Sequence, residues 1–278
     1  MQRKNKHVIL LSGFRRGGTN ILWNILQSHP KVCSPILETG QVFNKSLKLR
    51  FVTRMRKWFS DEKIASLIDS ELFKFKLKTL SHDDNRFKHP EQIYTEEEIK
   101  QSWLCLKSVD EDIELTDQLL KAYPGLQLIL LTRNGYALAE SFKRRGKEFD
   151  ETALHYKYIA SAFKKYSNKV EKSKLIKFED VVQDPFSVSK ELFEFLNLDP
   201  SELEYLRFKS KKTVDKEGKH NVSFGRENKK YWTSKDTVND FIVQDVNQNQ
   251  LKGINEKQME IFNNIAAEIL RDFGYKVL

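Results

Sequence analysis

A glycine-rich loop near the start of the chain offers the clearest chemistry in the sequence. Gly13 and Gly18 are separated by four residues, which is the frame of a phosphate-binding loop, and the loop follows an apolar run. Arg15 and Arg16 bring positive charge into the loop. The first backbone N–H groups of the next helix have no partner within that helix, so they favour an anion. An ordinary turn between a strand and a helix is the simpler alternative.

Two departures from the usual phosphate-binding loop bear on the reaction. Thr19 stands where the Lys that contacts the terminal phosphate is expected, and Asn20 stands where the metal-binding Ser or Thr is expected. Phosphoryl transfer from ATP depends on metal charge that neutralises the migrating group. The loop therefore favours transfer of a less highly charged group.

A second candidate anion site follows another apolar run, in the segment QLILLTRNGYALAESFKRRG. Arg133 comes at the end of the predicted strand, and Ser141 lies in the helix that begins shortly after it. Ligands of parallel α/β sheets bind at the carboxyl ends of the strands, where an Arg and a hydroxyl can hold one phosphate. A surface ion pair is the alternative for Arg133. Two anion sites on neighbouring strand ends suit a nucleotide phosphorylated at both its 5′ and 3′ positions.

Composition bounds the class of protein and the kind of partner. The 278 residues carry a formal net charge of +9, with 39% hydrophobic and 31% charged residues. We expect one α/β domain over residues 1–278 and an anionic partner: a nucleotide, an acidic glycan, a nucleic acid or a membrane surface. The basic run at 50–57 (RFVTRMRK) is either a nucleic-acid or lipid patch or a solvated helix face.

Cysteine and histidine usage gives no sign of a cross-link or a metal. Cys33 and Cys105 lie in apolar contexts, so no disulfide is expected, and the six histidines show no ligand spacing. No apolar run approaches the ~18 residues that span a bilayer. We expect neither a signal peptide nor a membrane anchor, and a cytoplasmic location.

Apolar runs that alternate with helical patterns predict a parallel sheet of about five strands with helices on both faces, a P-loop-like three-layer fold. The predicted strands are 7–12, 32–34, 104–107, 126–132 and 175–178. Helices are predicted over 18–28, 61–78 and 255–273, and a capping box at Thr95 to Glu98 predicts another.

The first loop resembles that of sulfotransferases that use 3′-phosphoadenosine 5′-phosphosulfate (PAPS). In that family a basic residue, Ser, Gly, Thr and a small polar residue precede a helix that ends in His-Pro. This chain has Arg16-Gly17-Gly18-Thr19-Asn20 and His29-Pro30. Gly17 replaces the usual Ser and Asn20 the usual second Thr, so backbone donors and Thr19 must hold the 5′-phosphosulfate, with Arg15 and Arg16.

Two further motifs extend the resemblance. The family's 3′-phosphate motif, an Arg with a Ser eight positions on, falls on Arg133 and Ser141. Its C-terminal Gly-Arg loop with a trailing Lys falls on Gly225, Arg226, and Lys229 or Lys230. The segment LIKFEDVVQDP also looks like the family's strand-turn-helix, with a structural role in which Glu179 or Asp180 caps a helix.

The resemblance implies a catalytic set of Arg16, Glu38 and Lys107. Glu38 falls close to the position of the base in carbohydrate and tyrosylprotein sulfotransferases, and a carboxylate that interacts with a helix N-terminus is the equal alternative. Arg16 would stabilise the departing phosphate oxygen, and Lys107, which ends a predicted strand, either neutralises charge in the transition state or is an exposed strand-end Lys. His29 is a weaker candidate for the base because His-Pro ends the helix.

The implied activity is metal-independent, in-line transfer of a sulfuryl group from PAPS to a hydroxyl group, with an amine as second choice. We expect the basic loop at 209–232 to cover the nucleotide and a helical insertion at about 40–100 to face the acceptor. A small molecule, a glycan, a lipid and a peptide all stay open as acceptors, as does the oligomeric state.

Three other functions are weaker readings of the same sequence. A small-molecule kinase needs a metal and a Lys at the position of Thr19. A non-catalytic nucleic-acid-binding protein would use the net charge, and its affinity would fall steeply with salt. A dinucleotide-dependent oxidoreductase lacks the G-x-G-x-x-G motif, although Glu38 lies about where a ribose-binding acid would.

Overall fold

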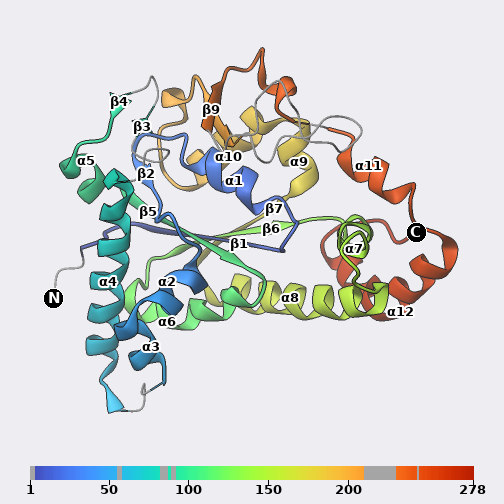
Figure 1. The fold of residues 1–278 in the computed structure, drawn as a ribbon, viewed down its shortest axis with the longest axis horizontal. Helices are drawn as coiled ribbons and strands as arrows, with labels where there is room; N and C mark the ends of the chain where they lie inside the picture. Colours follow the sequence, from blue (N-terminus) through green and yellow to red (C-terminus); the bar gives the residue numbers. More distant parts are fainter. Residues whose placement is uncertain (1–3, 55–57, 82–86, 89–91, 210–229, 243) are drawn as a thin grey trace.

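Five parallel strands form the centre of the molecule, with helices above and below them (Figure 1). In this computed structural model the described residues are 4–54, 58–81, 87–88, 92–209, 230–242 and 244–278. The sheet has the order β2-β5-β1-β6-β7. Its strands are β1 (Val8–Gly13), β2 (Val32–Cys33), β5 (Trp103–Val109), β6 (Gln127–Thr132) and β7 (Lys172–Lys177). The predicted fold class, a three-layer parallel α/β fold of about five strands, is confirmed.

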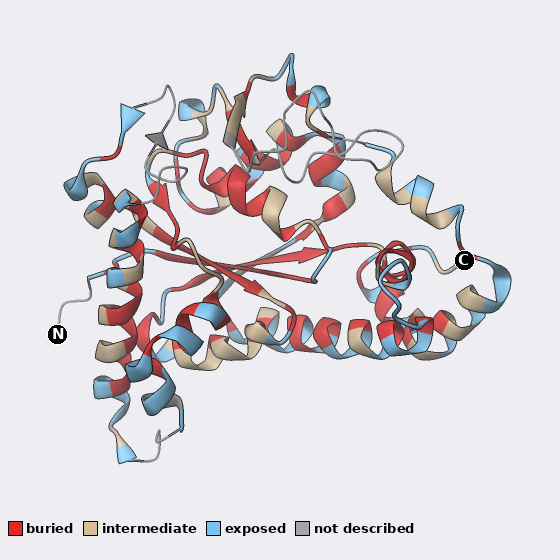
Figure 2. Ribbon diagram, in the orientation of Figure 1, coloured by how far each residue is buried: buried red, intermediate tan, exposed pale blue. Residues whose placement is uncertain are grey.

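Strand β1 lies between β5 and β6 because its residues are apolar on both faces. All six of its residues are buried, and Figure 2 shows the central strands of the sheet mostly in the colour of buried residues. Leu10 contributes to the core on one face, whereas Ile9 and Leu11 contribute to the core on the other. A continuous apolar run of this kind is typical of a central strand covered on both sides.

The two helical layers enclose different parts of the chain (Figure 1). One face is covered by α1 (Thr19–Leu26), α9 (Phe178–Gln183), α10 (Pro185–Phe195) and the hairpin of β8 (Leu206–Lys209) and β9 (Lys230–Thr233). The other face is covered by α4 (Asp61–Leu77), α6 (Thr116–Ala122), α7 (Gly135–Lys143), α8 (Phe149–Lys169) and α12 (Glu256–Asp272). The remaining elements are α2 (Thr39–Lys45), α3 (Leu47–Arg54), α5 (Glu96–Gln101), α11 (Val246–Leu251), β3 (Phe87–Lys88) and β4 (Gln92–Ile93).

Side-chain caps fix where several helices begin. Thr95 caps α5 in a capping box with Glu98, as predicted. Asn255 forms the same arrangement with Gln258 at the start of α12. The side chain of Asn134 accepts hydrogen bonds from two amides of the first turn of α7, which places this helix directly after Arg133.

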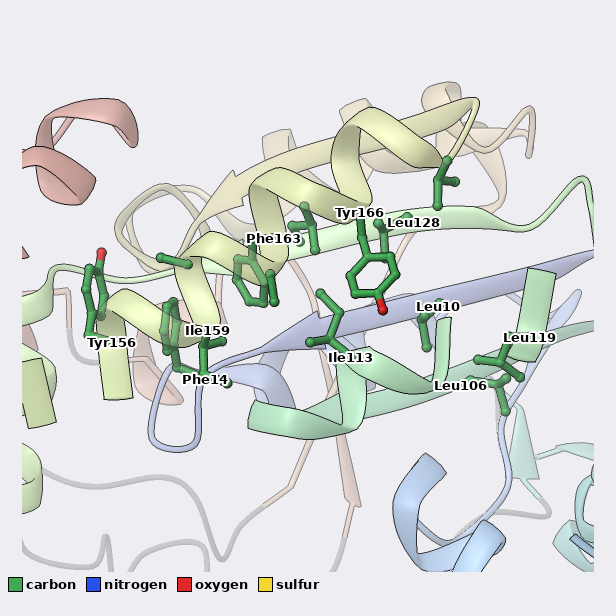
Figure 3. Packing of buried hydrophobic residues seen from close by; sticks show 14 of the residues in the cluster. Leu10, Phe14, Leu106, Ile113, Leu119, Leu128, Tyr156, Ile159, Phe163 and Tyr166 are labelled. Atoms are coloured by element: carbon green, nitrogen blue, oxygen red, sulfur yellow. The ribbon is translucent and has the colours of Figure 1, made fainter. Parts of the chain in front are cut away.

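The core below the sheet anchors the first loop. Phe14 stacks on Tyr156 of α8 with 4.7 Å between ring centroids, and Phe163 contacts it from the next turns of the same helix (Figure 3). Because Phe14 begins the loop, this packing holds the end of β1 against α8. The polar residues that follow Phe14 are therefore presented at the carboxyl edge of the sheet.

Strand β7 and the helix after it differ from the sequence prediction. β7 begins at Lys172, earlier than predicted, because an edge strand has one neighbour and tolerates the polar residues that obscured it in the sequence. The prediction that Glu179 or Asp180 caps a helix is wrong: Lys177 is the N-cap of α9, and both acidic residues lie in its first turn. The carboxylate of Glu179 instead accepts hydrogen bonds from Asn134, Asn247 and Tyr275.

Candidate functional site

Two residues of the loop after β1 lie in the left-handed backbone region. Arg16 has φ 67° and Gly18 has φ 90°, and Gly18 is the N-cap of α1, which receives no side-chain cap. A Cβ atom at Gly18 would collide with the ring of Phe178, so this position requires glycine for space as well as for conformation. The first amides of α1 therefore face the carboxyl edge of the sheet without a capping side chain, as an anion site requires.

Asp110, at the end of β5, fixes the loop from the side. Its carboxylate accepts a hydrogen bond of 2.7 Å from the amide of Arg15 and lies 3.3 Å from the Nε atom of the same residue. His155 of α8 lies 3.3 Å from Asp110, and this carboxylate raises the pKa of the imidazole. Asp110 itself has φ 54°, a conformation that costs energy for a non-glycine residue. Neither Asp110 nor His155 could be recognised from the sequence, because their contacts are with residues far away along the chain.

Lys107 joins the predicted base to the predicted phosphate loop. The Nζ atom of Lys107 lies 2.7 Å from Glu38 and donates a hydrogen bond of 2.8 Å to Asn20 Oδ1. Its side chain is 3% exposed and lies over the ring of Trp23. Burial lowers the pKa of Lys107, whereas the carboxylate of Glu38 opposes that effect. Lys107 is therefore a buried member of the site and not an exposed strand-end Lys.

Glu38 has the helix N-terminal contact that was one of its two predicted roles, and it also borders the cavity. It is the N-cap of α2 and forms a capping box with Gln41, so it interacts with a helix N-terminus. Its carboxylate also lines the cavity in front of the loop and contacts Lys107. Thr39, the first residue of α2, donates a hydrogen bond to the carbonyl of Lys107, which fixes this helix against β5.

Arg133 is buried at the end of β6, beside the loop. Its Nη1 atom donates to the carbonyl of Arg16 at 2.6 Å, and its guanidinium lies over the ring of Phe178. Its Nε and Nη2 atoms both donate to Asn247 Oδ1, at 2.8 and 2.6 Å, and Nη2 also donates to Gln250 Oε1. Burial lowers the pKa of Arg133 to about 10. The guanidinium N–H groups that would bind a phosphate thus already donate to the side-chain oxygens of Asn247 and Gln250 on α11.

One residue from each predicted anion site, Arg16 and Arg133, lines the same cavity of about 370 Å³. Ser141, which the sequence pairs with Arg133, accepts a hydrogen bond of 3.2 Å from Arg16 Nε. Arg145 also lines this cavity. It lies in the KRRG run that ends the segment after Arg133, and it was not among the residues predicted from the sequence. Burial and the charge of Arg145 lower the pKa of Arg16. Guanidinium groups that repel one another around one cavity attract an anion.

Part of the cavity wall is apolar. Phe178 and Val182 of α9 line it, together with Phe241 and Ile242 and with Val246, the first residue of α11. An aromatic and aliphatic wall beside several cations suits a ligand with a planar apolar part and an anionic part. Gly18, Thr19 and Asn20 also line the cavity, and Thr19 and Asn20 do so as the first residues of α1, whereas Gly17 lies in the loop before it.

Three residues of the predicted third motif, Gly225, Arg226 and Lys229, lie outside the described residues. Lys230 begins β9, and most of the basic loop at 209–232 is likewise outside them.

Within the described ranges no three His, Cys, Asp or Glu side chains are placed to hold a metal ion. Among those same residues no helix is long and apolar enough to span a bilayer.

A parallel sheet whose first strand runs through a glycine-rich loop into a helix defines the P-loop-like class of α/β proteins. A model of the sulfotransferase family matches residues 9–202, and the chain belongs to this family. The protein is therefore a sulfotransferase.

Solved structures agree with this fold. The sulfotransferase domain from the curacin biosynthetic pathway has a TM-score of 0.51 and 16% sequence identity, with 100% of each chain covered. The sulfotransferase domain from the Synechococcus PCC 7002 olefin synthase has a TM-score of 0.54 and 16% identity, with 100% of this chain and 98% of that chain covered. No curated protein matches the sequence.

Proposed function

We propose that this sulfotransferase moves the sulfuryl group of PAPS to a hydroxyl group of its acceptor, with an amine as second choice. The observation that carries the proposal is the cavity that Arg16, Arg133 and Arg145 line beside the ion pair of buried Lys107 and half-buried Glu38. The arginines suit the two phosphate groups of the nucleotide. The pair supplies a base and a cation at the end where a sulfuryl group would be transferred.

Each part of the nucleotide has a partner in this arrangement. The amides at the start of α1, with Thr19 and Arg16, hold the 5′-phosphosulfate. Arg133 and Ser141 hold the 3′-phosphate, and Arg226 joins them in the part of the proposal that rests on the family resemblance. The apolar wall that includes Phe178 receives the adenine ring.

The transfer is an in-line displacement at sulfur. Glu38 takes the proton of the acceptor hydroxyl as the oxygen forms its bond to sulfur. The bond between sulfur and the bridging oxygen of the 5′-phosphate breaks, and its electron pair stays on that oxygen. Arg16 and Lys107 stabilise the negative charge that develops there. The products are a sulfated acceptor and 3′-phosphoadenosine 5′-phosphate (PAP), and no step needs a metal.

The loop argues against a kinase on the same fold. Its only cationic side chains are Arg15 and Arg16, and Lys107 reaches Asn20 from a different strand. A Lys that follows the last glycine would be needed to hold the terminal phosphate of ATP. The proposed chemistry therefore requires a sulfuryl donor in place of a phosphoryl donor.

Calorimetry with PAP in the presence of EDTA tests the proposal, followed by transfer of labelled sulfate from PAPS to a panel of phenolic, glycan and lipid hydroxyls. We expect PAP to bind without metal and ATP with Mg²⁺ to support no transfer. Absence of PAP binding would overturn the proposal. Binding of an RNA oligonucleotide that weakens steeply with salt, without PAP binding, would favour the nucleic-acid alternative instead.

The contact between α11 and Arg133 yields a prediction for nucleotide affinity. Asn247 Oδ1 occupies the same two donors of Arg133 that a phosphate oxygen would use. A nucleotide has to displace it, and this competition weakens the observed affinity. Asn247→Ala is therefore expected to bind PAP several-fold more tightly than the wild type, as measured by calorimetry.

A ligand without the 3′-phosphate separates this effect from a general change in the cavity. Adenosine 5′-phosphosulfate should bind Asn247→Ala and the wild type equally well. Gln248→Ala, an exposed position on the same helix, serves as the control and should leave both affinities unchanged. Weaker PAP binding by Asn247→Ala would mean that the amide assists the phosphate and does not compete with it.

A further inference from the structure

Helix α3 presents an apolar ridge to solvent at a corner of the molecule. It lies below the sheet beside α4, and its surface is largely exposed (Figures 1 and 2). Leu47 is 76% exposed, Phe51 55% and Trp58, which follows the helix, 79%. Among the described residues no large hydrophobic side chain is more exposed than Leu47 and Trp58. Isolated exposed hydrophobic residues are common, but three in one short segment are not.

The ridge has a regular geometry. Leu47 and Phe51 are four positions apart and share one face of α3, whereas Leu49 is buried against the core. Phe51 meets Phe59 edge to face, with 5.8 Å between ring centroids, so the ridge continues into the start of α4. Because Leu49 packs against the core, the side chains of Leu47 and Phe51 on the other face of α3 are directed toward solvent.

Cations surround the ridge. Lys45, Lys48, Arg50 and Arg54 are exposed on α2 and α3, and Lys63 lies over the ring of Phe59. In the sequence, residues 45–63 contain seven Lys or Arg and two Asp or Glu, a net charge of +5 against +9 for the whole chain. Five of these cations, Lys45, Lys48, Arg50, Arg54 and Lys63, lie among the described residues close in sequence to the exposed apolar side chains.

We propose that this α3 surface, Lys45 to Arg54 with Trp58, docks the protein on an anionic lipid bilayer. Leu, Phe and Trp side chains partition into the region between headgroups and acyl chains, while Lys and Arg contact lipid phosphates. The proposal rests on exposure and charge complementarity and is independent of which sulfuryl donor the protein uses.

Two other occupants fit the surface less well. Single-stranded nucleic acid stacks its bases on aromatic rings, and Leu47, a fully aliphatic side chain, offers no such platform. A second copy of the chain would bring two strongly basic surfaces together, which repel each other. Only a bilayer offers negative charge and an apolar phase at the same surface.

The α3 surface adjoins α2, the helix that begins after Glu38. Arg50 and Arg54 of α3 line a cavity of about 530 Å³ together with Gly40 and Phe43 of α2 and with four acidic residues, Glu111, Asp112, Glu114 and Asp117. The N-cap of α2 is Glu38. A protein held on a membrane through α3 therefore has the C-terminal end of α2 close to the lipid surface.

Vesicle sedimentation tests the proposal, with vesicles of phosphatidylcholine alone and of equal parts phosphatidylcholine and phosphatidylglycerol. The double variant Phe51→Ser and Trp58→Ser keeps every charge and should partition onto the anionic vesicles at least about tenfold more weakly than the wild type. The matched control is Leu154→Ser with Tyr158→Ser on α8, whose side chains are 59% and 52% exposed. This control should bind as the wild type does.

A charge variant and a spectroscopic readout complete the test. Lys48→Glu with Arg54→Glu should also weaken partition, because each cation near an anionic surface strengthens binding roughly fivefold. The emission of Trp58 should shift to the blue on anionic vesicles, and Trp58→Phe should abolish that shift. Thermal melts of all the variants verify that they are folded.

Several results would overturn the proposal. Equal partition of the wild type and the Phe51 and Trp58 variant would reduce vesicle binding to a general effect of net charge. Equal binding to neutral and anionic vesicles would remove the role of the cations. If the wild type binds no vesicles, two other results are decisive. Loss of RNA binding in the Phe51 and Trp58 variant would assign the surface to nucleic acid. Loss of a dimer in that variant, seen by ultracentrifugation, would assign it to a second copy of the chain. PAP affinity should be unchanged throughout, so failure here leaves the proposed donor untouched.

Discussion

Glu38→Gln is expected to lower the turnover of sulfuryl transfer by roughly a thousandfold, the typical contribution of a general base. Gln keeps the shape of the side chain but cannot take the proton of the acceptor. The buried cation of Lys107 beside it would then have lost its carboxylate partner at 2.7 Å. PAP affinity should stay close to that of the wild type. Release of PAP from PAPS, with an acceptor from the panel that the wild type sulfates, provides the measurement.

The capping role of Glu38 calls for its own control. Gln41→Ala removes the other half of the capping box of α2 while leaving the carboxylate in place. This variant should lose some thermal stability and keep its turnover. Normal turnover in Glu38→Gln would place the base elsewhere, and an equal loss in both variants would mean that the helix start, and not the carboxylate, matters.

Arg133→Ala is expected to weaken PAP binding by about 3 kcal/mol, roughly a hundredfold, because a buried guanidinium that holds a phosphate is lost. Affinity for adenosine 5′-phosphosulfate, which lacks the 3′-phosphate, should change little. The comparison of the two ligands isolates the contact with the 3′-phosphate. Calorimetry on the same preparation of the variant gives both values.

Arg133 also supports the structure around it, through its bonds to Arg16 and to α11. Arg133→Lys keeps a positive charge but loses the planar fork, so it should recover only part of the PAP affinity. Equal losses for the two nucleotides in Arg133→Ala would show that the residue organises the cavity and does not read the 3′-phosphate. A melting temperature far below that of the wild type in both variants would point to the same conclusion.

The sheet could be predicted because each central strand is a continuous apolar run. Residues 8–13 and 127–132 are buried on both faces, and burial on both faces leaves an unmistakable pattern in the sequence. The edge strand β7 is polar in part, so only its last residues were visible. Short-range signals such as the capping box at Thr95 were equally readable, because they depend on residues three positions apart.

The neighbours of the site residues could not be predicted, because they come from distant parts of the chain. Asp110 reaches Arg15 across 95 positions, and Asn247 reaches Arg133 across 114. Glu179 illustrates the limit most clearly. Its place near a helix start suggested a cap, whereas its carboxylate accepts from the amide of Asn134 on the neighbouring strand end. Periodicity and spacing describe one element at a time and carry no information about such pairs.

The middle position of β1 in the sheet has a consequence for synthesis on the ribosome. Its two flanking partners, β5 and β6, are made only after residues 103 and 127, and α11 comes after residue 246. The loop after β1 is synthesised first, whereas β5, β6 and α11, which lie around it, are synthesised later. The growing chain therefore completes the cavity in front of the loop only after residue 246 has been made.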